Sequence, residues 1–317
     1  MSVVFIHVGL PKTGTTHLQD RLWWNRDLAF RHSGLLYPGN EMADHFHAAT
    51  HLQPGRYLDW VDPAFAGSWS TMVSQMRAWP GTSLVSHELF ATAREEQIES
   101  MVNDLSFADE VHVVVTVRDL ARQLPSVWQE NVKNQRLASF DDFVTSVRRH
   151  APRRTGSWGG DMEEEPFWEF QDYVGILGRW AKFVGPERAH LVTVAKSGTG
   201  ASSLWERFLS VLDVDPAPMT IDVPNNNTSL SAAQAELLRR LNSRLQPDDI
   251  EWDRYERVVK GHIIAKVLFA QTGGTPRGLS TEQRAWAADE AETMIDAVRV
   301  AGYPVTGDLG DLSVSTM

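Results

Sequence analysis

The first 25 residues constrain the fold of this chain most strongly. Ser2–Val8 is a short apolar run, rich in β-branched residues and followed by glycine and proline, which predicts a buried strand. Thr15–Asn25 has helical spacing, with Leu18 and Leu22 on one side. A glycine-containing turn joins the two segments. The opening segment therefore predicts the first half of a βα unit.

The same alternation continues along the chain and indicates an α/β fold with a parallel sheet. We expect loops at Gly34–His51 and Arg153–Pro166, and a partly helical pattern over Tyr57–Met76. Beyond Pro224 the pattern is wholly helical. The further strands expected are Thr82–Ser86, Val111–Val117 and Ala189–Ala195. The further helices expected are Ala93–Asn103, Ala121–Asn134, Phe140–Arg149, Phe167–Val184, Ser202–Leu212, Ser231–Asn242, Arg254–Ala270 and Ser280–Ala301, the last with Ser280 and Gln283 as a capping box.

Composition narrows the classes of function. Thirty Lys and Arg against 41 Asp and Glu give a formal net charge of −11, which argues against a general nucleic-acid binder. The absence of Cys excludes disulfides and thiol chemistry and fits a reducing cytoplasm. No stretch has the roughly 20 apolar residues that a membrane span needs. We therefore expect a soluble, cytoplasmic protein that does not bind nucleic acid.

The turn Gly9-Leu-Pro-Lys-Thr-Gly-Thr-Thr16 suits a phosphate, because a strand that leads into a helix N-terminus presents free N–H groups and a positive dipole. In the Walker A pattern the lysine follows the second glycine, whereas this chain has Thr15 there and its lysine at Lys12. No metal-binding Asp ends the strand Val111–Val117, which runs into Arg118. The loop thus fits a phosphate without the usual triphosphate-hydrolysing residues.

A second candidate phosphate site follows the strand that ends at Arg118. Ser126 lies eight residues further on, about two turns into the next expected helix. A guanidinium fork beside a hydroxyl is suited to clamp a terminal phosphate. Together, the two segments predict a ligand that carries a phosphate at each end.

These two segments resemble the donor site of sulfotransferases that use 3′-phosphoadenosine 5′-phosphosulfate (PAPS), in particular a bacterial, carbohydrate-type member. The resemblance covers Val3 to about Leu212. It implies a P-loop-like three-layer core with a central parallel sheet flanked by helices, plus a helical C-terminal part. It also implies one sulfotransferase domain over residues 1–317, with its α/β core at about 1–215 and a helical extension at about 225–317.

The resemblance also assigns the donor-binding residues. The first motif would hold the 5′-phosphosulfate, and Arg118 with Ser126 would hold the 3′-phosphate. Ala195-Lys196-Ser-Gly-Thr-Gly200 is only partly similar to an Arg-Lys-Gly segment of many cytosolic relatives, and on that basis Lys196 joins the donor site. The family's reaction needs no metal and releases adenosine 3′,5′-bisphosphate. The first motif contributes Pro11, Lys12, Thr13, Gly14, Thr15 and Thr16.

Transfer of a sulfuryl group needs a base for the acceptor proton as well as a lysine at the donor. Thr82-Ser-Leu-Val-Ser-His87-Glu88 places both common types of base just past a strand. We predict Lys12, Glu88 and His87 as catalytic residues, with Glu88 the base and His87 the alternative. Glu88 could instead serve only as the N-terminal charge of a helix.

Two segments are candidates for binding the acceptor. His45, His47 and His51 have metal-like spacing, but a polar substrate loop explains them equally well. Ser157–Trp168 is rich in Trp and Glu, and its Trp residues could equally belong to the core. The resemblance implies a small-molecule, carbohydrate or lipid acceptor. The identity of that acceptor, the choice between O- and N-sulfation and the oligomeric state stay open.

Two other functions would use the same fold. A P-loop kinase or NTPase would bind ATP with Mg²⁺. A non-catalytic module would bind a nucleotide without depending on Lys12 or Glu88 for turnover.

Overall fold

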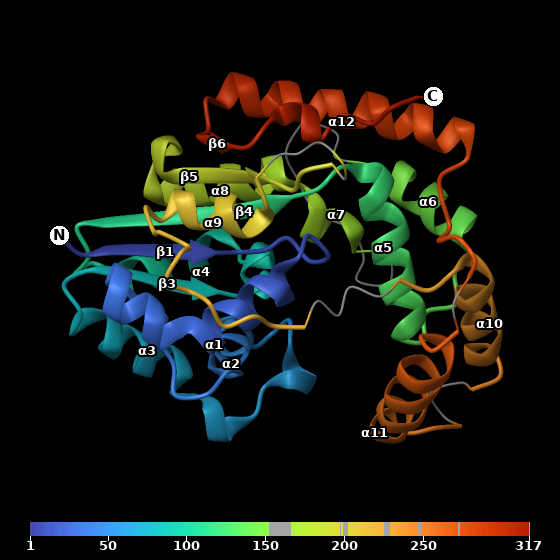
Figure 1. Ribbon diagram of the computed structural model, residues 1–317, viewed down its shortest axis with the longest axis horizontal. Helices are drawn as coiled ribbons and strands as arrows, with labels where there is room; N and C mark the ends of the chain where they lie inside the picture. The colour runs from blue at the N-terminus through green and yellow to red at the C-terminus, as the bar shows by residue number, and fades with distance from the viewer. Residues whose placement is uncertain are drawn as a thin grey trace. The chain divides into compact units, whose positions relative to one another are not determined.

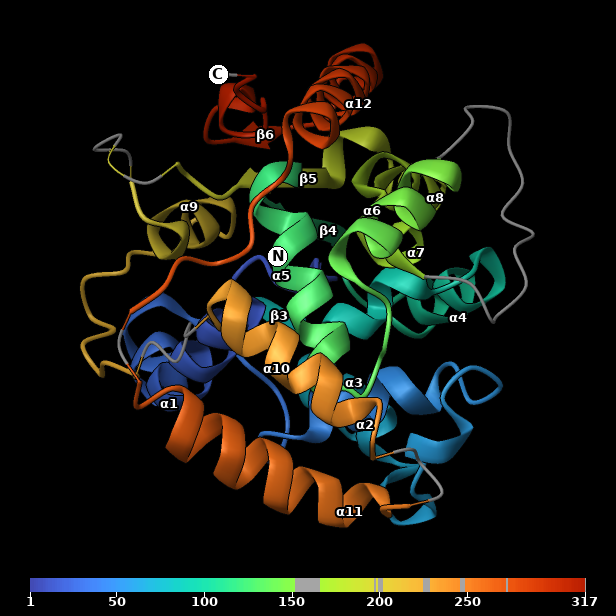
Figure 2. The ribbon, with the colours of Figure 1, turned by 90° about the vertical axis from the view of Figure 1, so that its right-hand side faces the viewer.

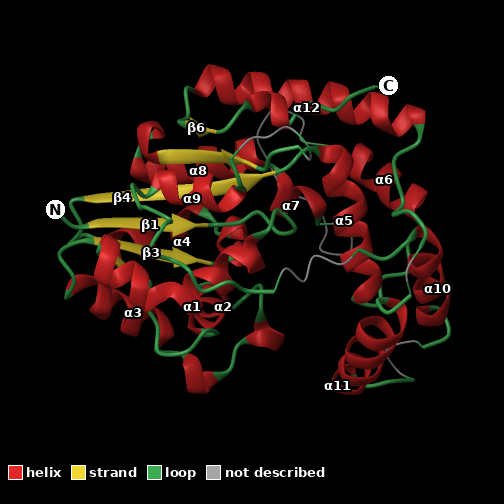
Figure 3. Ribbon diagram, in the orientation of Figure 1, coloured by secondary structure: helices red, strands yellow, loops and turns green. Residues whose placement is uncertain are grey.

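The computed structural model describes residues 1–151, 166–196, 198, 202–224, 229–245, 249–271 and 273–316. Within these residues six parallel strands form one sheet in the order β2-β3-β1-β4-β5-β6 (Figures 1 and 3). The predicted α/β fold with a parallel sheet is confirmed. The strands are β1 (Val3–His7), β2 (Leu35–Leu36), β3 (Thr82–Ser86), β4 (Glu110–Val117), β5 (Ala189–Thr193) and β6 (Val305–Thr306).

The chain divides into two compact units. Unit 1 comprises residues 1–119, 169–225 and 290–313, and it contains the sheet; unit 2 comprises residues 120–168, 226–289 and 314–317.

Strands β1 and β4 are buried on both faces, so helices cover both sides of the sheet. Unit 1 therefore has three layers, a sheet between two layers of helices. The face that carries Phe5 packs against α1 (Thr15–Ser33) and α9 (Leu204–Val211), through Leu18, Leu22 and Phe208. The other face is covered by α4 (Glu95–Asp104) and α8 (Tyr173–Val184), as Figure 2 shows. The remaining short helices of unit 1 are α2 (Asp44–His51), η1 (Leu58–Trp60), η2 (Pro63–Phe65), α3 (Ser68–Arg77), η3 (Glu88–Thr92), η4 (Pro186–Arg188) and η6 (Leu309–Asp311).

The structure corrects several sequence-based expectations. The single helix expected over Phe167–Val184 is divided at Asp172, whose side chain caps the N-terminus of α8. The segment 34–51 is not a loop throughout, because it contains β2 and α2. Helix α1 continues to Ser33, beyond the expected end at Asn25, and Gly34 terminates it at φ 64°. Finally, the chain is not wholly helical beyond Pro224, since β6 pairs with β5.

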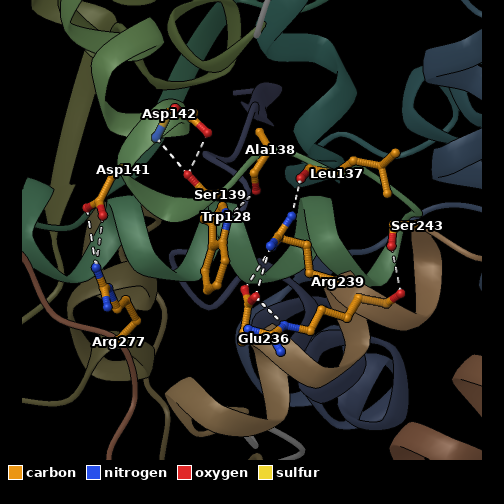
Figure 4. A network of polar contacts seen from close by, with 11 residues as sticks. Trp128, Leu137, Ala138, Ser139, Asp141, Asp142, Glu236, Arg239, Ser243 and Arg277 are labelled. Atoms are coloured by element: carbon orange, nitrogen blue, oxygen red, sulfur yellow. Dashed lines mark hydrogen bonds and ion pairs between the residues drawn. The ribbon is translucent and has the colours of Figure 1, made fainter.

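Unit 2 is helical in its described residues. Pro125 lies inside α5 and cannot donate the N–H that its turn would use. Figure 4 shows one of its polar networks, in which the Arg239 guanidinium binds the Glu236 carboxylate and the Leu137 carbonyl. The helices are α5 (Leu120–Lys133), α6 (Phe140–Arg149), α10 (Ala232–Asn242), α11 (Trp252–Tyr255) and the π-helix η5 (Glu256–Leu268).

Two helices contribute residues to both units. They are α7 (Phe167–Gln171) and α12 (Thr281–Ala301). The predicted capping box of α12 is confirmed, with Ser280 and Gln283 bonded to each other's backbone N–H. No helix among the described residues is long and apolar enough to cross a membrane.

Candidate active site

The first motif lies at the point where the order of the sheet reverses. Strand β1 has β3 on one side and β4 on the other, so the turn after β1 is flanked by the carboxyl ends of both neighbours. Ligands of open parallel sheets bind at such a switch point. The segments that follow β1, β3 and β4 begin with Val8, His87 and Arg118 respectively, so the first motif, Glu88 and Arg118 all lie at the carboxyl ends of neighbouring strands.

Hydrogen bonds from two threonine hydroxyls hold the loop of the first motif in place. The Thr13 hydroxyl donates to the Leu10 carbonyl at 2.6 Å and lies 2.6 Å from the Thr116 hydroxyl. Thr116 in turn donates to the Gly9 carbonyl at 3.0 Å, and the Leu10 N–H donates back to the Thr116 carbonyl at 3.0 Å. The side chain of Thr13 is therefore buried in the support of the loop, while its neighbour Lys12 is only partly buried.

Both glycines of the loop are required by its geometry. Gly9 has φ +98°, and a Cβ there would meet the Glu88 Cβ at 2.9 Å. Gly14 has φ +100° and serves as the N-cap of α1, so no side-chain cap covers the first N–H groups of the helix. Since Lys12 also has a positive φ of 66°, the loop turns tightly on itself. These features suit an anion at the N-terminus of α1.

Glu88 and His87 begin the short helix η3 directly beside this loop. The His87 N–H donates to the His7 carbonyl at 3.0 Å, which ties η3 to the end of β1. The Leu89 N–H donates to His87 Nδ1 at 3.2 Å, so this nitrogen is an acceptor and a neutral imidazole carries its proton on Nε2. Burial lowers the pKa of His87, and the Glu88 carboxylate opposes this effect.

A polar chain that sequence reasoning missed runs beneath the site. His7 places Nδ1 2.7 Å from the Ser86 hydroxyl and Nε2 3.3 Å from the Thr116 hydroxyl. The Gln19 amide donates to the Ser86 carbonyl at 3.3 Å and to Glu88 Oε2 at 3.2 Å. Ser86 thus contacts both His7, which reaches Thr116 below the loop, and Gln19, which holds Glu88. The only signals in the sequence were a histidine within an apolar strand and a glutamine on the first turns of α1.

The residues predicted to hold the 3′-phosphate fall in different parts of the chain. Arg118 follows the last residue of β4, in unit 1, and Ser126 lies in α5, in unit 2. Lys196 follows β5 and donates to the Gly310 carbonyl at 2.8 Å.

The three histidines of α2 have three separate partners. His45 is 2% exposed; its Nδ1 accepts the Ser86 N–H at 3.2 Å and its Nε2 donates to the Pro38 carbonyl at 2.8 Å. His47 stacks on Phe65 at 3.8 Å, and His51 Nε2 lies 2.8 Å from the Asp62 carbonyl. Among the described residues no group of three or more His, Asp or Glu side chains could hold a metal ion.

The second candidate acceptor segment lies mostly outside the described residues, which omit 152–165. Its last residue, Trp168, is 2% exposed and donates from its indole nitrogen to the Val147 carbonyl at 2.7 Å. Trp168 is therefore a core residue of unit 2, in agreement with the second of the two roles considered for it.

Comparisons with known proteins give one structural similarity. No family model matches the chain, and no curated protein matches it. A sulfotransferase from Alicyclobacillus acidocaldarius has a similar structure, with a TM-score of 0.37 and 17% sequence identity over 84% of this chain and 98% of that one. A similarity of this size does not establish the family or the activity of this chain.

Proposed function

We propose that this protein is a sulfotransferase that moves a sulfuryl group from PAPS to an acceptor hydroxyl or amine. The observation that carries the proposal is the contact between the Lys12-bearing loop and Glu88. A methyl group on Gly9 would meet the Glu88 Cβ at 2.9 Å, so an anion-binding turn and a carboxylate base lie side by side. This pairing supplies the two groups that the transfer requires, a cation at the donor and a base at the acceptor.

In the proposed reaction the acceptor oxygen or nitrogen attacks the sulfur in line with the bond to the 5′-phosphate, which breaks. The N–H groups at the start of α1 would bind the 5′-phosphosulfate, and the Lys12 ammonium would neutralise the charge that grows on the leaving phosphate. The proposed role of Arg118 and Ser126, with Lys196, is to hold the 3′-phosphate.

The geometry favours Glu88 over His87 as the base. His87 Nδ1 is the nitrogen that a neutral imidazole would use to accept a proton, and it already accepts the Leu89 N–H. Glu88 Oε2 receives a hydrogen bond from the Gln19 amide, which orients its carboxylate. We therefore assign proton removal to Glu88 and a supporting role to His87.

The position of Thr15 counts against the P-loop kinase or NTPase. In a Walker loop the catalytic lysine would stand at this position, where it would reach the phosphates. Here Thr15 is 3% exposed and occupies the first turn of α1. The single lysine of the loop is Lys12, on its leading side.

The proposal is tested with ³⁵S-labelled PAPS and pools of phenols, aliphatic alcohols, amines, lipids and carbohydrates. We expect labelled product with at least one pool, and losses of roughly 100-fold or more for Lys12→Ala and Glu88→Gln, in the range typical of a charge-stabilising group and a general base. Lys182→Ala and Glu99→Gln, which change exposed helical positions, serve as controls. Full activity of Glu88→Gln with an identified acceptor would refute its assignment as the base.

A further inference from the structure

We propose that the ring of the acceptor binds on an aromatic shelf beside His87, formed by Phe46, Tyr57 and Trp60. The acceptor class that fits is an uncharged hydroxyl compound with a planar hydrophobic ring. This inference rests on the proposed function, because it takes Glu88 as the base that receives the acceptor proton.

The shelf is continuous with the candidate active site. The Phe46 ring lies 5.5 Å from the His87 imidazole and 6.2 Å from the Trp60 indole, measured between ring centroids. Trp60 stacks on Tyr57 at 5.5 Å with an interplanar angle of 6°. The rings therefore lead away from the residue next to Glu88.

The outer end of the shelf is exposed although it is apolar. Trp60 is 53% exposed, and Leu58, two residues before it, is 72% exposed. An isolated exposed apolar residue needs no explanation, but neighbouring ones that extend a row of rings to a candidate active site form a surface suited to a ligand. An indole face offers a stacking partner for a flat ring.

The shelf is held against the same short helix that carries Glu88. The Tyr57 hydroxyl lies 2.8 Å from the Thr92 hydroxyl, which donates to Gln53 Oε1 at 2.9 Å. The Gln53 amide donates in turn to the Leu89 carbonyl at 2.9 Å. Because Leu89 and Thr92 belong to η3, the rings and the base form one braced assembly. Because these side chains are already held in place, binding of a ring there would cost the protein little conformational entropy.

Charge near the shelf disfavours an anionic acceptor. The Arg56 guanidinium lies 5.6 Å from the centroid of the Tyr57 ring, but its charge is paired with the Glu169 carboxylate. Asp62 follows η1 and is exposed, and Glu88 is anionic when it acts as a base. The polar side chains that brace the shelf, Gln53 and Thr92, bond to each other, and Trp60 is its most exposed ring, whereas Tyr57 is buried behind it. This arrangement favours a hydrophobic ring over a sugar, which needs polar partners around its rim.

The test separates ring binding from sulfuryl transfer. Binding of 2-naphthol and of a methyl glucoside is measured by saturation-transfer NMR without any donor, for the wild type, Trp60→Ala and Trp60→Phe. Trp24→Ala is the matched control, because Trp24 is 60% exposed on α1. We expect 2-naphthol to bind and Trp60→Ala to weaken it roughly 3- to 10-fold, the range of one aromatic stacking contact. Trp60→Phe should retain most of the affinity, and Trp24→Ala all of it.

Kinetics with the identified acceptor complete the test. The KM for a ring acceptor should rise in Trp60→Ala by a similar factor, while the KM for PAPS stays unchanged. Equal binding of 2-naphthol by the wild type and Trp60→Ala would overturn the shelf, even if transfer to another acceptor were found. Trp60-dependent binding of 2-naphthol without any transfer would instead uphold the shelf and count against the sulfotransferase assignment.

Discussion

The Gln19 amide nitrogen lies 3.2 Å from Glu88 Oε2, so a residue on the helix that follows the anion-binding loop holds the carboxylate that follows β3. The same amide donates to the Ser86 carbonyl at 3.3 Å. These contacts hold one oxygen of the Glu88 carboxylate in place. Gln19 is thus a positioning residue for the proposed base.

The first prediction concerns this contact. We expect Gln19→Ala to lower kcat roughly 10-fold, because a misplaced base transfers protons less efficiently. Gln19→Glu should also change the kcat–pH profile, because it places a second carboxylate beside the proposed base. Pre-steady-state rates across a pH series provide the measurement. A profile identical to the wild type for Gln19→Glu would contradict the positioning role.

The second prediction tests the close approach of the loop to η3. Gly9→Ala combines a left-handed backbone angle with a contact of 2.9 Å to the Glu88 Cβ, and we expect it to lower the free energy of unfolding by about 1–3 kcal/mol. Gly55→Ala is the control, because a Cβ there meets no atom within 4 Å. Urea denaturation of both variants provides the comparison. Equal stabilities would show that the loop does not have this conformation.

The third prediction concerns a buried ion pair in unit 1. Arg207 and Asp311 are 5% and 7% exposed, with Nη1 and Oδ2 2.5 Å apart, and Thr193 donates to the same carboxylate at 2.8 Å. Burial raises the pKa of Asp311, but the bonds from Arg207 and Thr193 outweigh it and lower the pKa overall.

Removal of one partner leaves the other charge buried. We expect Asp311→Ala to cost about 3–5 kcal/mol in the free energy of unfolding. Asp27→Ala breaks an exposed pair with Arg31 and should cost less than about 1 kcal/mol. If both substitutions cost the same amount in urea denaturation, Asp311 is not buried as described.

The fourth prediction is a loss of stability in mild acid. Burial lowers the pKa of His45 to about 4 and that of His7 to about 3, from an ordinary value of 6.5. Between these values and 6.5 the unfolded chain binds more protons than the folded one. The free energy of unfolding should therefore have its highest value above pH 6.5 and should fall as the pH decreases toward 4.

His45→Gln should reduce this pH dependence, because glutamine does not titrate. Lowering the pKa of His45 from 6.5 to about 4 corresponds to a loss of about 3 kcal/mol in the free energy of unfolding, once His45 is protonated in both the folded and the unfolded chain. Urea denaturation at several pH values between 7.5 and 4.5 tests the slope. An unchanged slope in His45→Gln would show that His45 is not buried in its neutral form.

The sequence predicted the parts of this structure that depend on local patterns. The strand Thr82–Ser86 and the helix Phe140–Arg149 have the expected bounds, because a short buried run and helical apolar spacing respectively determine them. Helix α2 was missed because its histidines resemble a polar loop, whereas His45 is buried by contacts with Pro38 and Ser86. Strand β6 is two residues long, too short for a sequence pattern, and it is a strand only because it pairs with β5.

The candidate site likewise contains residues that local sequence patterns predict and residues that they do not. Lys12 and Glu88 stood out because each follows a strand in a recognisable motif. Gln19 and His7 did not, because their roles come from contacts with residues far away in the sequence. The acceptor shelf likewise needs the folding of η1 beside η3, which no local pattern encodes.

The central claim is that the loop after β1 binds a 3′-phosphorylated adenine nucleotide, and its most direct test is a thermal-shift titration in the presence of EDTA. We predict that adenosine 3′,5′-bisphosphate raises the Tm by several degrees at hundredfold excess over its Kd, and that Lys12→Ala reduces the shift. ATP with Mg²⁺, measured without EDTA, should give a much smaller shift. The absence of any shift with adenosine 3′,5′-bisphosphate at saturating concentration, or a larger shift with ATP and Mg²⁺, would contradict the claim.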